Sequence, residues 1–348
     1  MLLFTMEKEQ FFEFMRKIPK AEIHLHLEDF LAGEAAREEQ VKSLSDFVLL
    51  FRSVQDSLRD MEDMTIAFKN IVRYMKQNGV VYAEVFFSPG RFLRQFGWDY
   101  QNLVKFFEKF ARDIRRRQGF VIKFLVDISR SHGVDNASDV LDHVIKYRSR
   151  DIIGIGLGGD EEIGPARDYA QLFKRARESG LRTVAHAGES DGPHSIMDAV
   201  KLLQAERIGH ATSAVDCPEV LDYLIKNQIP LEIAPTSNLV IGKYVKDISA
   251  HPLKQYLEKG AFITLNTDDP TLFNTCLVGE YWNLYHKMGY DVRHLYFIIV
   301  NGFRASFMSD GKKRNYIKMV NKTWRDNVQL ETNDGWKSGF INMFEGRK

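Results

Sequence analysis

The chain has few of the features that mark secreted or membrane proteins. Its 348 residues contain two cysteines, Cys217 and Cys276, which lie far apart and outside any CxxC pattern. A disulfide framework is therefore not expected, and a reducing, cytoplasmic compartment suits the chain. No apolar run approaches the roughly 18 residues of a membrane span, and the N-terminal "MLLFTMEKEQ" lacks the long apolar core of a signal peptide. We expect a cytoplasmic protein without a membrane partner.

An excess of charge of one sign is also absent. The 48 basic residues almost balance the 47 acidic ones, and the formal net charge is +1. Basic clusters such as "RDIRRRQG" carry no aromatic stacking pattern and are typical of the polar face of a helix. We therefore predict no nucleic-acid partner. The oligomeric state stays open.

No Pro/Ser-rich linker or low-complexity tract divides the chain. Instead, short runs rich in β-forming residues alternate with longer amphipathic helical stretches. Parallel strands need such helical crossovers, and eight strands close a (β/α)8 barrel. We predict an α/β fold, a (β/α)8 TIM barrel that forms a single domain over residues 1–348. The predicted strands are "EIHLHL", "VYAEVFFS", "VIKFLVDIS", "IIGIGLGG", "RTVAHAG", "ERIGHAT", "PLEIAPTS" and "FITLNTDD".

A doubly wound open sheet is the competing fold. Such a sheet would carry a Gly-rich phosphate-binding fingerprint after its first strand, and "HLHLEDF" has none. The barrel is therefore favoured.

The chain is longer than a minimal barrel, and the additions are predicted to be helical. We expect an N-terminal helix from Glu7 to Lys17, a helical insertion after the first strand at about residues 29–60, and a C-terminal helical tail. Within the insertion, apolar residues including Phe47, Phe51 and Val54 recur on one helical face. The segment is either a packing helix or a lid that also lines a substrate pocket.

Polar residues stand at the ends of the predicted strands, where barrel enzymes place their catalytic groups. His24 and His26 end the first strand, and the two-residue period of a strand puts both side chains on one face. Further polar residues at strand ends are Gly159, Asp160 and Glu161 of "GGDE", His186 and Glu189 of "HAGE", His210 of "RIGH", and Asp268 and Asp269 of "NTDDP".

Each of these residues has a structural explanation when taken alone. A single histidine in a barrel is usually hydrogen-bonded, and Asp-Asp-Pro is common turn chemistry. Their joint placement at one mouth favours a metal site, because buried charges are costly unless they are paired or metal-bound. Imidazoles with a carboxylate suit a first-row divalent metal, most plausibly zinc. A binuclear site would want a bridging lysine after the fourth strand, and "GLGGDEE" has none, so we predict one Zn2+.

The motifs "PKAEIHLHLE", "VYAEVFFSP", "GGDE", "VAHAGES", "RIGHAT", "PTSN" and "TLNTDDP", in this order, resemble the adenosine deaminase family of the amidohydrolase superfamily. The resemblance runs from about Pro19 to Tyr285. The zinc base deaminases with the H-x-E…P-C-x-x-C signature are a separate lineage, and that signature is missing here. By this resemblance the zinc ligands are His24, His26, His186 and Asp268, the last also counted as catalytic.

The resemblance also implies roles around a purine ring. Glu189 matches the acid that protonates N1, and His210 the residue that activates water together with the metal. Asp269 matches the group that hydrogen-bonds N7, and the backbone of Gly159 the contact to N3. Two further substrate contacts are expected at strand ends, from Glu28 toward the sugar and from Ser88.

Some residues depart from the family pattern. Asp29 stands where glycine or another small residue is usual, which suggests a changed turn or a different substrate tail. The phrases "FRSVQDSLRD", "VVYAEVFFSP" and "VDISRSHGVDNA" are similar to the branch that deaminates 6-aminodeoxyfutalosine in menaquinone synthesis. In that branch Arg130 could bind an acidic, benzoate-like tail through its bidentate guanidinium. The alternative for Arg130 is a structural ion pair with a carboxylate of the mouth.

The resemblance implies a zinc-dependent hydrolytic deaminase that converts a 6-aminopurine nucleoside, adenosine or 6-aminodeoxyfutalosine, to the 6-oxopurine and ammonia. Deamination of adenine or a modified adenine is an alternative. A metal-dependent amide or ester hydrolase, or a barrel kept as a binding protein, are the alternatives from other classes.

Overall fold

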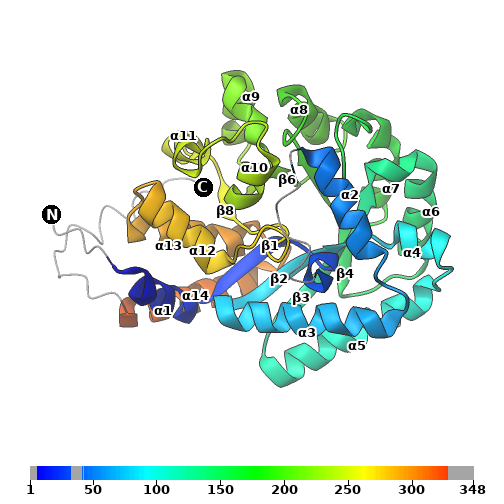
Figure 1. The fold of residues 1–348 in the computed structure, drawn as a ribbon, viewed down its shortest axis with the longest axis horizontal. Coiled ribbons are helices and arrows are strands. Elements are labelled where there is room, and N and C mark those ends of the chain that lie inside the picture. The colour runs from blue at the N-terminus through cyan, green and yellow to red at the C-terminus, as the bar shows by residue number, and fades with distance from the viewer. Residues whose placement is uncertain (1–5, 33–40, 42, 328–348) are drawn as a thin grey trace.

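A computed structural model describes residues 6–32, 41 and 43–327. Eight parallel strands form one sheet in the order β1 to β8, with flanking helices around it (Figure 1), which confirms the predicted TIM barrel. Each predicted strand overlaps an observed one, but the predicted seventh strand was too long, because Pro235 begins the helix α10 (Pro235–Ile241), and the eighth strand ends at Leu265, before the predicted "NTDD". The strands are β1 (Lys20–His26), β2 (Val80–Phe87), β3 (Val121–Ser129), β4 (Ile152–Gly158), β5 (Arg182–Ala187), β6 (Arg207–His210), β7 (Leu231–Ile233) and β8 (Ile263–Leu265).

The barrel closes through residues that follow β8. The backbone N–H of His26 donates to the carbonyl oxygen of Asp268, and the N–H of Asp268 donates to the carbonyl oxygen of His24, both at 3.2 Å. Below this pair, the N–H of Ile23 donates to Oδ1 of Asn266 at 3.0 Å. The first and last strands are thus tied together at the end of the barrel where the predicted ligands lie.

The crossover helices begin and end with local signals that the sequence carries. For example, the Asp60 side chain accepts hydrogen bonds from the first turn of α3, and Gly79 ends that helix with φ +68°. A Cβ at Gly79 would lie 2.4 Å from the carbonyl oxygen of Arg16, so only glycine fits. The helices that follow the strands are α3 (Met61–Asn78), α4 (Pro89–Gln95), α5 (Tyr100–Gln118), α6 (Gly133–Lys146), α7 (Ala170–Glu178), α8 (Pro193–Lys201), α9 (Pro218–Lys226), α10 (Pro235–Ile241), α11 (Leu253–Glu258), α12 (Leu277–Trp282) and α13 (Val292–Ala305).

The predicted terminal helices are present as α1 (Lys8–Lys17) and α14 (Asp310–Asn327). Phe14 of α1 packs edge-to-face on Trp324 of α14, with ring centroids 5.2 Å apart. Within the described residues, no helix combines the length and the apolarity that crossing a bilayer requires.

The predicted insertion forms a short 3-10 turn, η1 (Glu28–Leu31), and helix α2 (Leu44–Gln55). Residues 33–40 and 42 of the insertion lie outside the described part. Phe47 of α2 stacks on Phe273 in the loop after β8, with ring centroids 4.7 Å apart. Whether the whole chain is one domain, and whether α2 moves as a lid, stay predictions.

Candidate metal centre and active site

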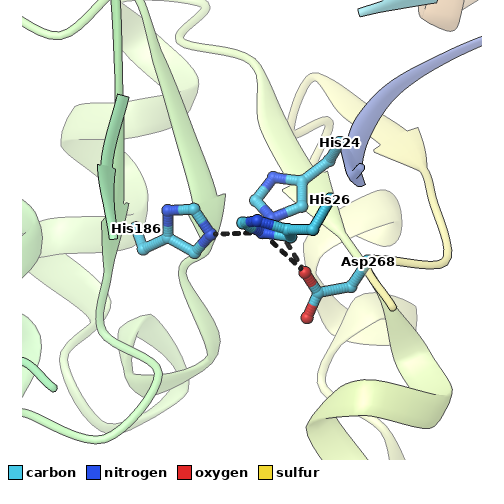
Figure 2. A group of neighbouring side chains, drawn as sticks. All are labelled: His24, His26, His186 and Asp268. Atoms are coloured by element: carbon cyan, nitrogen blue, oxygen red, sulfur yellow. Dashed lines mark hydrogen bonds and ion pairs between the residues drawn. The ribbon is translucent and has the colours of Figure 1, made fainter. Parts of the chain in front are cut away.

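Four side chains meet at the C-terminal end of the barrel. His24 and His26 come from β1, His186 from β5, and Asp268 from the loop directly after β8; Figure 2 shows them pointing toward one another. One ligand atom of each lies within 4.8 Å of the others, and all four residues are buried. The Oδ1 atom of Asp268 lies 3.3 Å from Nε2 of His24 and 3.2 Å from Nε2 of His26. Nε2 of His186 lies 3.3 Å from Nε2 of His26.

These separations fit a metal ion. Protein ligand atoms that share one zinc ion, each at roughly 2.0–2.2 Å from it, lie about 3–3.5 Å from one another. Without a metal, a cluster of imidazole nitrogens that face each other in a buried site leaves polar atoms unsatisfied. Nε2 of His24 has no hydrogen-bond partner among the described residues. The donor set and its spacing therefore fit a single zinc ion.

A second layer of groups orients the histidines. Nδ1 of His24 lies 2.6 Å from Oε2 of Glu232, and Nδ1 of His186 lies 3.1 Å from the carbonyl oxygen of Leu157. Both acceptors place the imidazole proton on Nδ1, which leaves Nε2 free for a metal. The sequence analysis missed Glu232. An acidic residue inside the apolar strand "LEI" was the available signal.

Glu232 is itself held by a buried arginine. Arg207 donates from Nε to Oε1 of Glu232 at 2.5 Å, and its Nη1 lies 2.6 Å from Oε2 of Glu84. Although burial disfavours the charged form of Glu232, Arg207 and His24 hold the pKa of this carboxyl below its ordinary value. The network therefore supplies an ionised acceptor to His24 at the base of the metal centre.

Glu189 lies beside the metal ligands as a candidate acid. Burial, followed by the charges of Asp268 and Glu161, raises its pKa well above the ordinary value. A carboxyl group with a raised pKa keeps its proton to a higher pH than an exposed one and can act as a proton donor. The backbone around Glu189 is fixed by Glu161, whose Oε1 accepts from the N–H of Glu189 at 2.7 Å and of Ser190 at 3.1 Å. The other oxygen of Glu161 accepts from the N–H of Gly188 at 2.8 Å.

His210 is the last residue of β6, has a left-handed backbone conformation with φ +64°, and is fully buried. Its Nδ1 lies 3.0 Å from Nδ2 of Asn238, and its Nε2 lies 3.6 Å from Oε2 of Glu189. Burial lowers the pKa of His210 to about 4. The imidazole is therefore neutral at pH 7.

The carboxyl of Asp269 is buried, and its Oδ1 has no hydrogen-bond partner among the described residues. Burial and the neighbouring charges of Asp268 and Asp29 raise its pKa well above the ordinary value. Asp29, which replaces the usual small residue, accepts from the N–H groups of Thr271 and Leu272, both at 2.8 Å. The side chain of Asp29 therefore holds the backbone of the loop that carries Asp269.

A cavity of about 640 Å³, its open mouth included, lies above this site. Most of the predicted site residues line the cavity together with apolar residues of α2. The lining residues are His26, Leu44, Phe47, Val48, Phe51, Arg52, Gln55, Ser88, Asp127, Ser129, His132, Gly159, His186, Glu189, His210, Asp268 and Asp269.

Two predicted substrate contacts lie outside that lining. Glu28 is fully buried, and its Oε1 accepts from the N–H of Ser88 at 2.8 Å and from the amide of Gln55 at 3.3 Å. Arg130 is also buried, because the 3-10 turn after β3 carries its side chain inward, where Nη2 donates to the carbonyl oxygen of His186 at 2.6 Å. Arg52 of α2 lines the cavity instead, and the sequence analysis did not single it out.

Comparisons with known proteins find similar sequences and a similar fold. The adenosine deaminase family model matches residues 29–323. An aminodeoxyfutalosine deaminase of Streptomyces avermitilis is 31% identical over 86% of this chain and 90% of the relative. An adenine deaminase of Wolinella succinogenes is 29% identical over 88% and 98%, respectively. The crystal structure of an adenine deaminase from Arthrobacter aurescens matches with a TM-score of 0.83 at 26% identity, over 88% of this chain and 99% of that one.

Proposed function

This chain belongs to the adenosine deaminase family and is a hydrolytic deaminase of adenine-type compounds, and we propose that it uses one Zn2+ to deaminate a 6-aminopurine nucleoside. The observation that carries the proposal is the meeting, in one buried cavity, of a four-ligand metal cluster with two carboxyl groups whose pKa values are raised, Glu189 and Asp269. An amide or ester hydrolase would have no use for both acids.

The metal would be held by His24, His26, His186 and Asp268. When bound, zinc lowers the pKa of a water molecule to near 7 and so supplies hydroxide at neutral pH. The protein's own groups then act on the purine.

Protonated Glu189 donates to N1, which takes up electron density as the ring is attacked at C6. Protonated Asp269 donates to N7 and orients the base. Gly159 lines the cavity, which supports the proposal that its backbone N–H donates to N3. These three donors match the three ring acceptors of a 6-aminopurine. The bond between C6 and the amino nitrogen then breaks, the departing amine takes the proton of the hydroxyl group added at C6, and the products are the 6-oxopurine and ammonia.

The outer cavity supports a substrate larger than free adenine. Helix α2 contributes an apolar wall with Phe47 and Phe51, whose ring centroids lie 6.0 Å apart, and the half-buried Arg52 stands on the same helix. Burial, followed by the charges of Arg52, Arg91 and Arg94, lowers the pKa of His132 in the cavity wall. Aromatic rings beside a cation suit an apolar tail that ends in a carboxylate. This favours 6-aminodeoxyfutalosine over adenosine, with Arg52 in the role proposed from the sequence for Arg130.

The test incubates purified, metal-analysed protein separately with 6-aminodeoxyfutalosine, adenosine and adenine, following ammonia release and the purine absorbance. A kcat/KM for 6-aminodeoxyfutalosine at least about tenfold above the others is the expected result. A preference for adenosine would contradict the proposed acidic tail of the substrate. A preference for adenine would contradict the proposal that the substrate is a nucleoside. No turnover of any of the three by the zinc-loaded protein would overturn the proposed function.

A further inference from the structure

A chain of three buried polar side chains leads away from the cavity to the backbone of α11. The N–H of Leu253 lies 2.9 Å from Nδ1 of His251, and Nε2 of His251 lies 3.2 Å from Oδ1 of Asn238. Nδ2 of Asn238 lies 3.0 Å from Nδ1 of His210. His251 is 1% exposed and Asn238 is 3% exposed. His210 is the member of this chain that lines the cavity.

The direction of every hydrogen bond in the chain follows from its backbone end. The N–H of Leu253 can only donate, so Nδ1 of His251 must accept. Burial lowers the pKa of His251 to about 3, so the ring is neutral and its one proton sits on Nε2. That proton is donated to Oδ1 of Asn238, which turns the amide N–H groups toward His210. Nδ1 of His210 therefore accepts and carries no proton, so the ring proton is on Nε2.

We propose that Asn238 and His251 are positioning residues that fix His210 as the Nε2–H tautomer, so that His210 offers the attacking oxygen a hydrogen-bond donor and not a base. Nε2 has no hydrogen-bond partner among the described residues, and it lies 3.6 Å from Glu189 at the cavity floor. A fixed N–H aimed at the place where negative charge develops stabilises it without reorganisation. The tautomer stands on the geometry, and its part in turnover rests on the proposed function.

The placement of α10 explains why the chain needs both residues. Ser237, the residue before Asn238, donates from Oγ to Oδ2 of Asp268 at 2.8 Å. Two neighbouring side chains of α10 thus bind the site: Ser237 binds the proposed metal ligand Asp268, and Asn238 binds His210. His251, on the segment between α10 and α11, fixes the orientation of the Asn238 amide, which could otherwise rotate by half a turn and present its oxygen to His210.

The first experiment reads the tautomer directly. Zinc-loaded protein labelled with 15N-histidine gives long-range 1H–15N correlations, with the His210 signals assigned from their loss in His210→Gln. Wild type is expected to show the His210 proton on Nε2. In Asn238→Asp the carboxylate can only accept, so the proton moves to Nδ1 or the ring becomes doubly protonated.

His251 is tested by two replacements. Glutamine places an amide N–H donor near the position of Nε2 and should keep the Nε2–H form of His210. Leucine removes the donor and should leave His210 with mixed tautomers. Asn227→Asp, an asparagine at the exposed end of α9, is the matched control for the added charge and should leave the His210 spectrum as in wild type.

Kinetics on the preferred purine give the functional readout. Asn238→Asp and His251→Leu are expected to lower kcat by about 100-fold with KM changed by less than about threefold, and His251→Gln should recover most of the loss. Circular dichroism and zinc content establish that each variant is folded and loaded.

The proposal is overturned if Nε2 of wild-type His210 carries no proton. An unprotonated Nε2 would instead indicate that His210 acts as a base or binds the metal. It is also overturned if Asn238→Asp leaves the tautomer unchanged, or shifts it with kcat intact. Failure of the proposed function would look different, because none of the tested purines would then be turned over while the wild-type spectrum still showed the Nε2 proton.

Discussion

The buried carboxylate of Glu232 is expected to control metal affinity without touching the metal. It accepts from Nδ1 of His24 at 2.6 Å and from Nε of Arg207 at 2.5 Å. In Glu232→Gln only one oxygen can accept, and the amide N–H groups face the other donor. If they face His24, its Nδ1 must accept and its proton moves to Nε2, the atom that a metal requires free. If they face Arg207, its buried guanidinium loses one of its two carboxylate partners and keeps only Glu84.

Either outcome weakens the centre by an amount that can be bounded. Loss of an outer partner of a metal-bound histidine typically costs 10- to 100-fold in affinity, which is about 1.4–2.7 kcal/mol. We therefore expect the Zn2+ dissociation constant of Glu232→Gln to rise by about 10- to 100-fold. The measurement is competition between apo protein and a chromogenic chelator of known zinc affinity.

The control is Glu206→Gln, the same substitution in a surface pair where Glu206 lies 2.6 Å from Arg182. This variant should bind zinc as wild type does, because an exposed pair contributes little. A Glu232→Gln protein that binds zinc within about twofold of wild type would refute the outer-partner role. A fall in zinc affinity of the same size in both variants would indicate a general loss of stability.

Three further results are expected. Arg52→Gln should lower kcat/KM for 6-aminodeoxyfutalosine by about 10- to 100-fold and leave adenosine unaffected, whereas Arg94→Gln, an exposed arginine 3.6 Å from Asp139, should affect neither. Glu161→Gln removes a negative charge that helps keep Glu189 protonated, so the activity should fall off at a lower pH on its alkaline side, and an unchanged pH profile would contradict this role. Burial lowers the pKa of His251 in the folded protein to about 3, below its ordinary value of 6.5. Between pH 6.5 and pH 3 the unfolded chain therefore binds one more proton than the folded chain at this residue, and lowering the pH through this range destabilises the fold. Urea titrations of apo protein at pH 7, 6 and 5 should show wild type losing up to about 1.4 kcal/mol per pH unit more than His251→Gln, and parallel losses would contradict the assignment.

The strands and the residues at their ends could be predicted from sequence because the signals are local. The alternation in "EIHLHL" puts His24 and His26 on one face whatever the rest of the chain does, and turn residues mark where strands such as "RTVAHA" stop. Once eight parallel strands are predicted, their C-terminal ends must share one mouth, so the polar residues at the strand ends could be grouped from sequence, and the family resemblance selected four of them as metal ligands. The roles of the individual residues in substrate binding and catalysis stay predictions.

The sequence by itself thus determined the barrel, its extra helices and the set of polar residues at its mouth. The tertiary structure decided which side chains support that set: Glu232 behind His24, Asp29 under the loop of Asp269, and His251 with Asn238 behind His210. It also placed Arg52 in the cavity lining and buried Arg130 against the backbone carbonyl of His186. The physical reason is separation along the chain. His24 and Glu232 are 208 residues apart, and no local pattern records which donor meets which acceptor when the barrel closes.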